Sequence, residues 1–324
     1  MAELPPTADL GTDIPPALVP ADVERIHELR RSIEGVIRGK TEVVELTLVT
    51  LFAQGHLLIE DVPGVGKTML AQALARSLDA SFRRIQFTSD LLPSDIVGVS
   101  IYQPQTGEFE FKPGPIFTNV LLADEINRAT PKTQSAMLEA MNEAQVSIDS
   151  RSYPIPQPFI VLATQNPIEH QGTYPLPESQ LDRFLMRVRM GYPSEEAERA
   201  LLEAQQIEHP IDSVEPVMTR RDVVAIQHAV RRVRVDPSIV DYLVRIAGAS
   251  RRSDKLALGV SPRGNLLLQR ASQARALLEG RDFVVPDDVQ AIAAPVLSHR
   301  VIPRGPSAAE PIVDELLSDV AVPL

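Results

Sequence analysis

The sequence predicts an α/β fold in which a parallel five-stranded sheet lies between helices (an αβα sandwich) and is followed by a small all-helical domain. Three observations lead to this prediction. Short apolar strands alternate with helical stretches as far as Tyr192-Pro193, a glycine-rich turn joins the first strand to a helix, and only helical patterns follow. Such alternation is typical of a parallel sheet with helices on both faces. The length of 324 residues agrees with two domains of about 150 residues each.

The amino-terminal segment and two helices precede the sheet. Residues 1–20 contain five prolines, three acidic residues and no Lys or Arg, which predicts a flexible acidic arm. A helix begins near Asp22, because apolar side chains recur at helical spacing as far as Ile37. A second helix spans Thr41–Gln54, with Thr41 as its cap and Gly55 as its stop.

The first domain, residues 21–193, contains the five strands. Each strand is a short apolar run, and helices such as Lys67–Leu78 and Thr133–Glu143 separate most of them. A β-hairpin is predicted at Val146–Ile155, around a polar turn. The strands are placed at His56–Glu60, Phe82–Phe87, Val120–Ala123, Phe159–Ala163 and Phe184–Met190.

The second domain, residues 194–309, shows helical patterns throughout. Two of its helices begin with a capping residue followed by proline, at Asp236-Pro237 and Ser261-Pro262. Residues 310–324 hold four acidic residues and no basic one, and we expect them to form an acidic C-terminal tail. The predicted helices are Ser194–Gln206, Thr219–Val233, Pro237–Ser250, Ser261–Leu278 and Pro286–His299.

The composition excludes several classes of function. The chain has no cysteine, which excludes disulfides, thiolate zinc sites, iron–sulfur clusters and a cysteine nucleophile. The formal net charge of −11 argues against a nucleic-acid or anionic-membrane ligand, although the two terminal segments carry much of that charge. The apolar runs are too short to span a membrane, and residues 1–20 lack the features of a secretory signal. We therefore expect a cytoplasmic protein.

The strongest functional motif joins the first predicted strand to the next helix. Asp61-Val-Pro-Gly-Val-Gly-Lys-Thr68 matches a phosphate-binding loop in all but its first position. The small residues let backbone N–H groups approach phosphate oxygens, and the start of the helix adds partial positive charge. The lysine can reach the β- and γ-phosphates, and the threonine hydroxyl can bind Mg²⁺. The residues expected to hold the nucleotide are Asp61, Val62, Pro63, Gly64, Val65, Gly66, Lys67, Thr68 and Met69.

Asp61 stands where this motif has glycine. Aspartate tolerates the backbone angles of a turn, so the loop can still form. Its carboxylate must then point away from the phosphates, because two negative groups at close range repel one another and weaken binding.

Two further predicted strands end in polar side chains. Asp124 and Glu125 follow the apolar run that starts at Val120. Asp124 is suited to hold Mg²⁺, and Glu125 is placed to orient and deprotonate an attacking water. Asn166 follows the next strand, where the strand ends of a parallel sheet meet the ligand crevice, and is a candidate to position the γ-phosphate or the water.

The order of these motifs, with a helical domain after them, resembles the AAA+ ATPases, a class of P-loop NTPases, and more closely the MoxR family. The resemblance extends from about Ile33 to Arg300. Its long matching stretches are more specific than the phosphate loop alone. They are Phe87-Thr-Ser-Asp-Leu-Leu-Pro-Ser-Asp-Ile-Val-Gly98, Ala123-Asp-Glu-Ile-Asn-Arg-Ala129, Leu162-Ala-Thr-Gln-Asn-Pro-Ile168 and Leu176-Pro-Glu-Ser-Gln-Leu-Asp-Arg-Phe184.

The resemblance implies roles for residues that spacing alone leaves open. Asn166 matches the sensor-1 residue. Arg183 matches the arginine finger, which reaches the γ-phosphate of the neighbouring subunit, whereas its local pattern alone favours a surface ion pair with an adjacent carboxylate. Arg187 is a second candidate for the finger, and Arg263 matches the sensor-2 arginine of the helical lid domain.

Three segments of the resemblance have weaker support from the residues themselves. Ile37, Arg38 and Gly39 match a segment that borders adenine, but an ordinary helix end explains them equally well. Residues 89–118 resemble the helix-two insert of this clade, and Val146–Ile155 resembles the hairpin before sensor 1. In rings of this clade both elements face the pore or the ring surface and can touch a client, but ordinary surface loops explain them too.

The resemblance implies a ring-forming ATPase, expected to be a hexamer, that binds ATP and Mg²⁺ between subunits. Hydrolysis would remodel a protein client, for cofactor or metal insertion or for complex assembly, with a partner protein that carries a von Willebrand factor A domain. No nucleic-acid ligand and no direct membrane insertion are expected. The alternatives are a nucleic-acid motor, which the acidic charge disfavours, a metal-chelatase motor subunit, and a small-molecule kinase, which the Asp124–Glu125 pair disfavours.

Overall fold

The computed structural model of the chain describes residues 20–149, 151–167, 172–196, 198–199, 210–306 and 308–323. The predicted amino-terminal arm and most of the helix predicted at 194–206 lie outside these residues.

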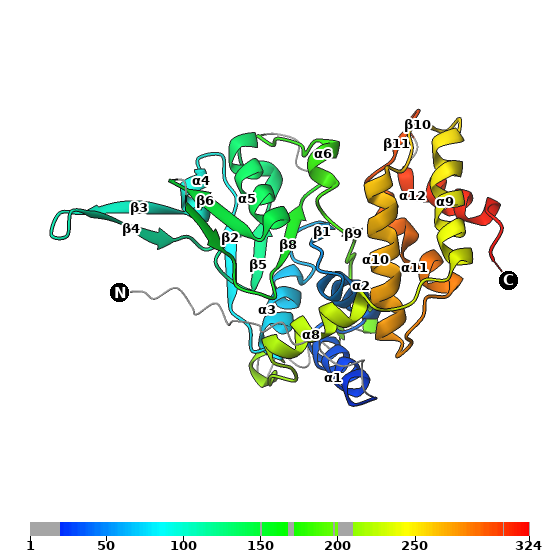
Figure 1. The fold of residues 1–324 in the computed structure, drawn as a ribbon, viewed down its shortest axis with the longest axis horizontal. Coiled ribbons are helices and arrows are strands. Elements are labelled where there is room, and N and C mark those ends of the chain that lie inside the picture. Colours follow the sequence, from blue (N-terminus) through cyan, green and yellow to red (C-terminus); the bar gives the residue numbers. More distant parts are fainter. Residues whose placement is uncertain are drawn as a thin grey trace.

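Five parallel strands form the central sheet in the order β2–β5–β8–β1–β9, which confirms the predicted sheet (Figure 1). Because β1 pairs with β8 and β8 pairs with β5, the loops that leave these three strands start side by side. These are the loops in which the sequence places the functional motifs. The strands are β1 (Leu57–Glu60), β2 (Phe82–Gln86), β5 (Val120–Asp124), β8 (Ile160–Gln165) and β9 (Met186–Val188).

Helices cover both faces of the sheet, because successive strand side chains point to opposite sides. Leu57 and Ile59 belong to the core that contains α1, α2 and α3, whereas Leu58 belongs to the core beneath α4 and α5. α2 begins at Thr41 with Lys40 at the capping position and no side-chain cap, so the prediction that Thr41 caps the helix is wrong. The helices are α1 (Pro20–Val36), α2 (Thr41–Phe52), α3 (Lys67–Ser77), α4 (Pro93–Val97), α5 (Pro131–Glu143) and α6 (Glu178–Leu181).

Two β-hairpins extend from this layered domain. The segment compared with a helix-two insert contains β3 (Gly98–Gln103) and β4 (Glu108–Pro113), which project away from the sheet as a long arm (Figure 1). The hairpin predicted at Val146–Ile155 is confirmed as β6 (Gln145–Ile148) and β7 (Arg151–Pro154).

The rest of the chain is mainly helical, and most of it packs beside the sheet near β9 (Figure 1). The caps predicted at Asp236 and Ser261 are confirmed: their side chains accept from the N–H groups of Ser238 and Gly264. A short antiparallel pair, β10 (Leu256–Leu258) and β11 (Ile302–Pro303), is added to the helices; runs this short carry no period that a sequence reading can detect. The helices are α8 (Arg220–Val230), α9 (Pro237–Arg252), α10 (Pro262–Leu278) and α11 (Pro286–Leu297).

The segment 310–324 is not a tail over most of its length. Residues Ala309–Asp319 form α12, which packs against α9 and α11. Ile312, Val313 and Leu317 are buried in the main core, at the spacing of one helical face. The acidic residues lie on a helix that belongs to the folded domain. Charge alone was therefore a poor guide to where the folded domain ends.

Candidate active site

The phosphate-binding loop connects β1 to α3, as the sequence predicts. Gly64 and Gly66 have φ angles of 86° and 99°, in the left-handed region that side chains other than glycine rarely adopt. The first turn of α3 has no side-chain cap, so its backbone N–H groups remain available to an anion.

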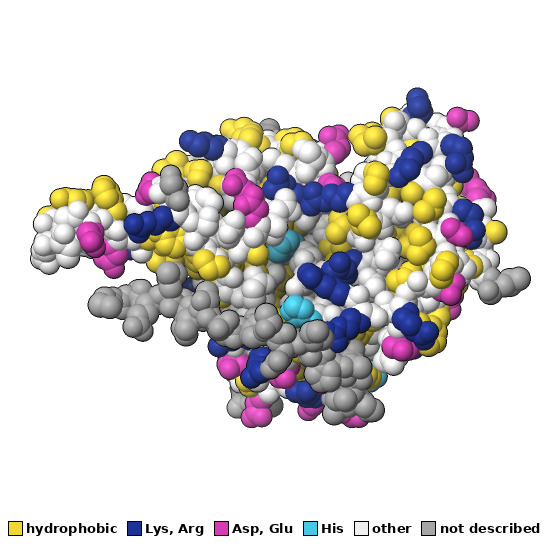
Figure 2. Space-filling view, in the orientation of Figure 1, with side chains coloured by type: hydrophobic (Ala, Val, Ile, Leu, Met, Phe, Trp, Pro, Cys, Tyr) yellow, Lys and Arg dark blue, Asp and Glu magenta, His cyan; other side chains and the backbone are white. Residues whose placement is uncertain are grey.

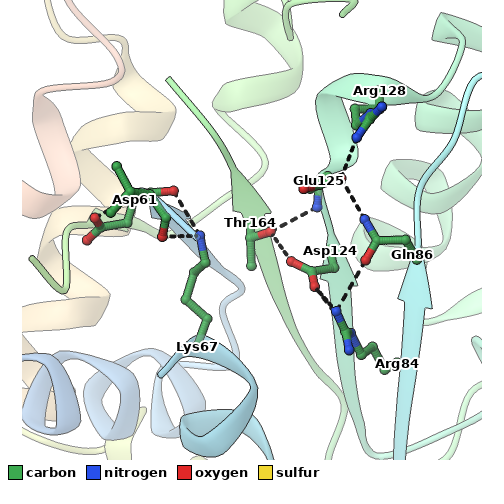
Figure 3. A network of polar contacts seen from close by, with 9 residues as sticks. Asp61, Lys67, Arg84, Gln86, Asp124, Glu125, Arg128 and Thr164 are labelled. Carbon is green, nitrogen blue, oxygen red and sulfur yellow. Dashed lines mark hydrogen bonds and ion pairs between the residues drawn. The ribbon is translucent and has the colours of Figure 1, made fainter. Parts of the chain in front are cut away.

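Lys67 is held on the loop that it follows. Its Nζ donates to the carbonyl oxygens of Asp61, at 2.8 Å, and Val62, at 3.2 Å (Figure 3). Partial burial lowers the pKa of Lys67, while the nearby carboxylates of Asp124, Asp61 and Glu125 act in the opposite direction.

The Asp61 carboxylate points away from the pocket that the loop borders, as the sequence analysis requires. Its Oδ1 accepts from the N–H of Val62 at 2.8 Å, and its Oδ2 accepts from the N–H of Gly191 at 2.5 Å. Gly191 lies just beyond β9, so this side chain connects the phosphate loop to the end of the sheet domain. Asp61, which stands where the motif usually has glycine, thus joins the phosphate loop to the segment after β9.

Asp61→Ala is expected to lower the free energy of unfolding by about 1–3 kcal/mol, because the part-buried N–H of Gly191 loses its hydrogen bond to a buried carboxylate. Urea unfolding measures this loss. Asp61→Asn is the matched control: it keeps one acceptor oxygen and should lose less. Equal stability of the alanine variant and the parent chain would contradict the link.

The acidic pair lies at the end of β5, opposite the phosphate loop (Figure 3). Asp124 Oδ1 accepts from the Thr164 hydroxyl at 2.5 Å, and Oδ2 accepts from Arg84 Nη2 at 2.6 Å. Glu125 has a left-handed backbone (φ 56°), a conformation that costs non-glycine residues about 1–3 kcal/mol and often marks functional sites. Its N–H donates to the same Thr164 hydroxyl at 2.9 Å.

The Glu125 carboxylate is occupied by two donors. Gln86 Nε2 donates to Oε2 at 2.6 Å, and Arg128 Nη1 lies 3.1 Å from the same oxygen. Both donors contact Oε2 and hold the carboxylate in one orientation, which leaves the other oxygen, Oε1, to take a proton from a water molecule.

Sequence reasoning missed four residues of this network: Arg84, Gln86, Arg128 and Thr164. Arg84 and Gln86 are two positions apart on β2, so they share one face, and Gln86 pairs in register with Asp124 on β5. The polar residues of β2 indicate that one face of this strand is polar. Which site that face joins depends on which strand lies beside β2. Thr164 was quoted in the sequence but not recognised as the link between Asp124 and Glu125.

A single pocket of about 360 Å³ brings the predicted motifs together. Two of its lining residues, Thr68 and Asp124, offer the hydroxyl and carboxylate oxygens that Mg²⁺ prefers, and Mg²⁺ needs few protein ligands because it keeps several waters. The described residues contain no group of three or more acidic or histidine side chains that would form a complete metal cage. The lining residues are Pro63, Gly64, Gly66, Lys67, Thr68, Met69, Arg84, Gln86, Asp124, Glu125, Thr164 and Asn166.

The structure does not bring Arg183 and Arg263 to this pocket, but it does bring them together elsewhere. Arg183 Nη1 donates to the Leu138 carbonyl oxygen of α5 at 2.7 Å. Arg263 Nη2 donates to Asn142, one turn further along α5, at 3.3 Å, and its Nε lies 3.4 Å from Asp182. Lys67 and these two arginines therefore do not converge on one triphosphate within a single chain.

Arg187 already has ion-pair partners within its own chain. It forms ion pairs with Glu60 at 3.8 Å and with Glu310 of α12 at 2.7 Å, and 17 % of its side chain is exposed. This position argues against Arg187 as the finger and in favour of Arg183.

The predicted adenine segment forms the turn between α1 and α2. Ile37 is buried and Gly39 has a φ of 73°. The next residue, Lys40, donates to the Tyr192 carbonyl oxygen at 2.7 Å, beside the Gly191 contact of Asp61. The turn lies near the loop but not in the lining of the 360 Å³ pocket, so adenine contact stays a prediction.

Comparisons with known proteins agree with these motifs. The profile of the "ATPase family associated with various cellular activities (AAA)" matches residues 56–186, and the profile of the AAA lid domain matches residues 248–320. No described helix is long and apolar enough to cross a membrane.

Several relatives that are similar over most of their length are named MoxR. The chain is 41% identical to chaperone MoxR1 of Mycobacterium tuberculosis, over 98% of this chain and 88% of the relative. It is 53% identical to the uncharacterized protein YeaC of Bacillus subtilis, over 90% and 93% of the two chains. A crystal structure from Cytophaga hutchinsonii, whose name gives it as a candidate ATPase, aligns with a TM-score of 0.87 at 36% identity, over 94% of this chain and 96% of that one.

Proposed function

Because the chain belongs to the MoxR family of AAA+ ATPases, we propose that it hydrolyses ATP at the subunit interfaces of a homo-oligomeric ring and thereby remodels protein clients. A hexamer is the expected ring. The support comes from how the site residues divide between two surfaces of one chain.

The first surface is the pocket beside the phosphate loop. Backbone N–H groups of residues 64–67 and the Lys67 ammonium bind the β- and γ-phosphates. Thr68 and Asp124 hold Mg²⁺, which neutralises charge on the phosphate oxygens. The Asp124 carboxylate that would bind this cation is the one that pairs with Arg84 in the structure.

Water activation falls to Glu125, with Asn166 beside it. Gln86 and Arg128 hold Glu125 through Oε2, and its other oxygen, Oε1, can accept a proton from a water aimed at the γ-phosphate. Asn166 lies at the end of β8 in the lining of the same pocket, where its amide can orient the γ-phosphate or that water.

The second surface carries Arg183 and Arg263, and this division is the observation on which the proposal depends. Both side chains lie against α5, outside their own pocket. Arg263 is about half exposed, with 53 % of its side chain accessible. An arginine that stabilises the transition state must touch the transferred phosphoryl group, so these residues serve the nucleotide of the adjacent subunit.

The mass of the particle in solution tests this proposal. Light scattering on the full chain with Mg²⁺ and a non-hydrolysable ATP analogue should give a ring mass near six times the chain mass of 35.6 kDa. A monomer mass at every nucleotide condition and at micromolar chain concentration would contradict an interfacial site.

The client and the partner are proposed from the family. A relative is named a chaperone, which supports a protein client rather than nucleic acid, in agreement with the acidic chain. The expected partner contains a von Willebrand factor A domain, and its capture on a Glu125→Gln ring with ATP, but not on an ADP-loaded ring, would support the assignment.

A further inference from the structure

Arg300, just after α11, is a buried cation whose bonds converge on the segment that carries Arg183. Only 1 % of its side chain is exposed. Nε donates to Asp182 Oδ1 at 2.9 Å, and Nη2 donates to the Asp182 carbonyl oxygen at 3.2 Å and to that of Phe184. Nη1 donates to the Leu185 carbonyl oxygen at 3.1 Å and to the Val296 carbonyl oxygen of α11. Arg300 therefore binds the backbone on both sides of residue 183.

The same cluster connects to the second proposed trans arginine. The Asp182 carboxylate accepts from Arg300 through Oδ1, and its Oδ2 lies 3.4 Å from Arg263 Nε. The neighbouring His299 places Nε2 3.1 Å from the Phe184 carbonyl oxygen. One carboxylate and one short backbone segment thus join the helical domain to the segment before β9.

Arg300 stays charged in this environment. Burial lowers its pKa to about 10, and Asp182 acts in the opposite direction. A buried guanidinium is costly unless its donors are satisfied, and here most of its donors end on residues 182–185. Figure 2 shows Lys and Arg side chains gathered along the junction between the sheet domain and the helical domain on the face in view.

We propose that Arg300 is a positioning residue for Arg183: by binding the backbone on both sides of Arg183, it makes the helical domain set where the finger stands at the neighbouring nucleotide. This inference rests on the proposed function, because it assigns Arg183 to a site in the next subunit. Arg300 itself touches neither nucleotide. The predicted consequence is a chain whose own pocket works normally but whose finger is displaced.

Arg300→Ala is expected to lower turnover by about 10²-fold, since displacement of a catalytic group by about 1 Å has effects of that size. Its affinity for a fluorescent ADP analogue should stay unchanged, because Arg300 does not line the pocket. Arg304→Ala is the matched control: Arg304 donates to Leu256 within the helical domain, so its loss should not change turnover. Unchanged turnover in Arg300→Ala would overturn the inference.

Mixed rings separate a misplaced finger from a damaged fold. Arg300→Ala and Glu125→Gln chains are each inactive alone. In a mixed ring, the intact pocket of an Arg300→Ala chain receives Arg183 from a neighbouring Glu125→Gln chain, and turnover should return. Thermal unfolding verifies that Arg300→Ala is folded. If it is not, Arg300→Lys replaces it, since lysine keeps the charge but cannot span both sides of residue 183.

A parallel mixture of Arg183→Ala with Glu125→Gln chains tests the interfacial site separately from the role of Arg300. If this mixture regains turnover and the Arg300 mixture does not, the role of Arg300 is overturned while the interfacial site stands. If neither mixture regains turnover, the interfacial site itself is wrong.

Discussion

Glu125→Gln is expected to lower ATP turnover by about 10²–10⁴-fold, because the amide cannot accept a proton from the attacking water. Glutamine keeps the shape of the side chain and can still contact Gln86, so the pocket should retain its form. ATP binding should therefore persist, and ATP should remain uncleaved in the complex. Phosphate release measures the loss, and a fluorescent ATP analogue measures the binding.

Glu139→Gln is a control matched in chemistry and charge. Glu139 is exposed on α5 and does not line the pocket, so its replacement should leave turnover unchanged. If Glu125→Gln retained turnover within a few-fold of the parent chain, the acidic pair at the end of β5 would not be the catalytic centre.

Arg183→Ala is expected to lower turnover by about 10³-fold or more, the range measured for arginine fingers in other NTPases. Nucleotide affinity should not change, because Arg183 lies outside the pocket of its own chain. Steady-state kinetics and nucleotide titration on the same preparation separate the two effects: kcat should fall and the dissociation constant should not.

Arg187→Ala provides the contrast. Arg187 is paired with Glu60 and Glu310, so its loss should reduce the free energy of unfolding by about 1–3 kcal/mol and leave most of the turnover in the folded protein. The opposite pattern, with turnover lost in Arg187→Ala and kept in Arg183→Ala, would transfer the finger role to Arg187.

Local sequence signals predicted the sheet and the pocket well. Most of the five strands are short apolar runs, although β2 carries three polar residues, and the phosphate loop combines glycines, a lysine and a threonine within eight residues. Asp124 ends β5 and Asn166 directly follows β8, and the carboxyl ends of parallel strands meet at the same edge of a sheet, so both residues could be assigned to that edge without a predicted strand order.

Residues whose roles depend on long-range pairing were not predictable. Gln86 reaches Glu125 only because β2 lies beside β5 in a particular register. Arg300 reads in the sequence as an ordinary helix end, and its five donors acquire meaning only where the helical domain meets residues 182–185.

Acidic charge led to a wrong prediction for the C-terminal segment, whereas the spacing of its apolar residues indicates a helix with one buried face. The last segment was expected to be a tail because it is acidic, yet Ile312, Val313 and Leu317 line one face of α12 and are buried. Glu310 on the same helix pairs with Arg187, which places part of the C-terminal segment next to β1 and β9.

The turnover number per subunit, measured as a function of chain concentration at saturating ATP and Mg²⁺, tests the central claim most directly. Because the pocket and the finger belong to different subunits in this account, turnover per subunit should rise with concentration and level off where the ring is complete. A constant turnover per subunit down to concentrations at which light scattering detects only monomer would contradict it.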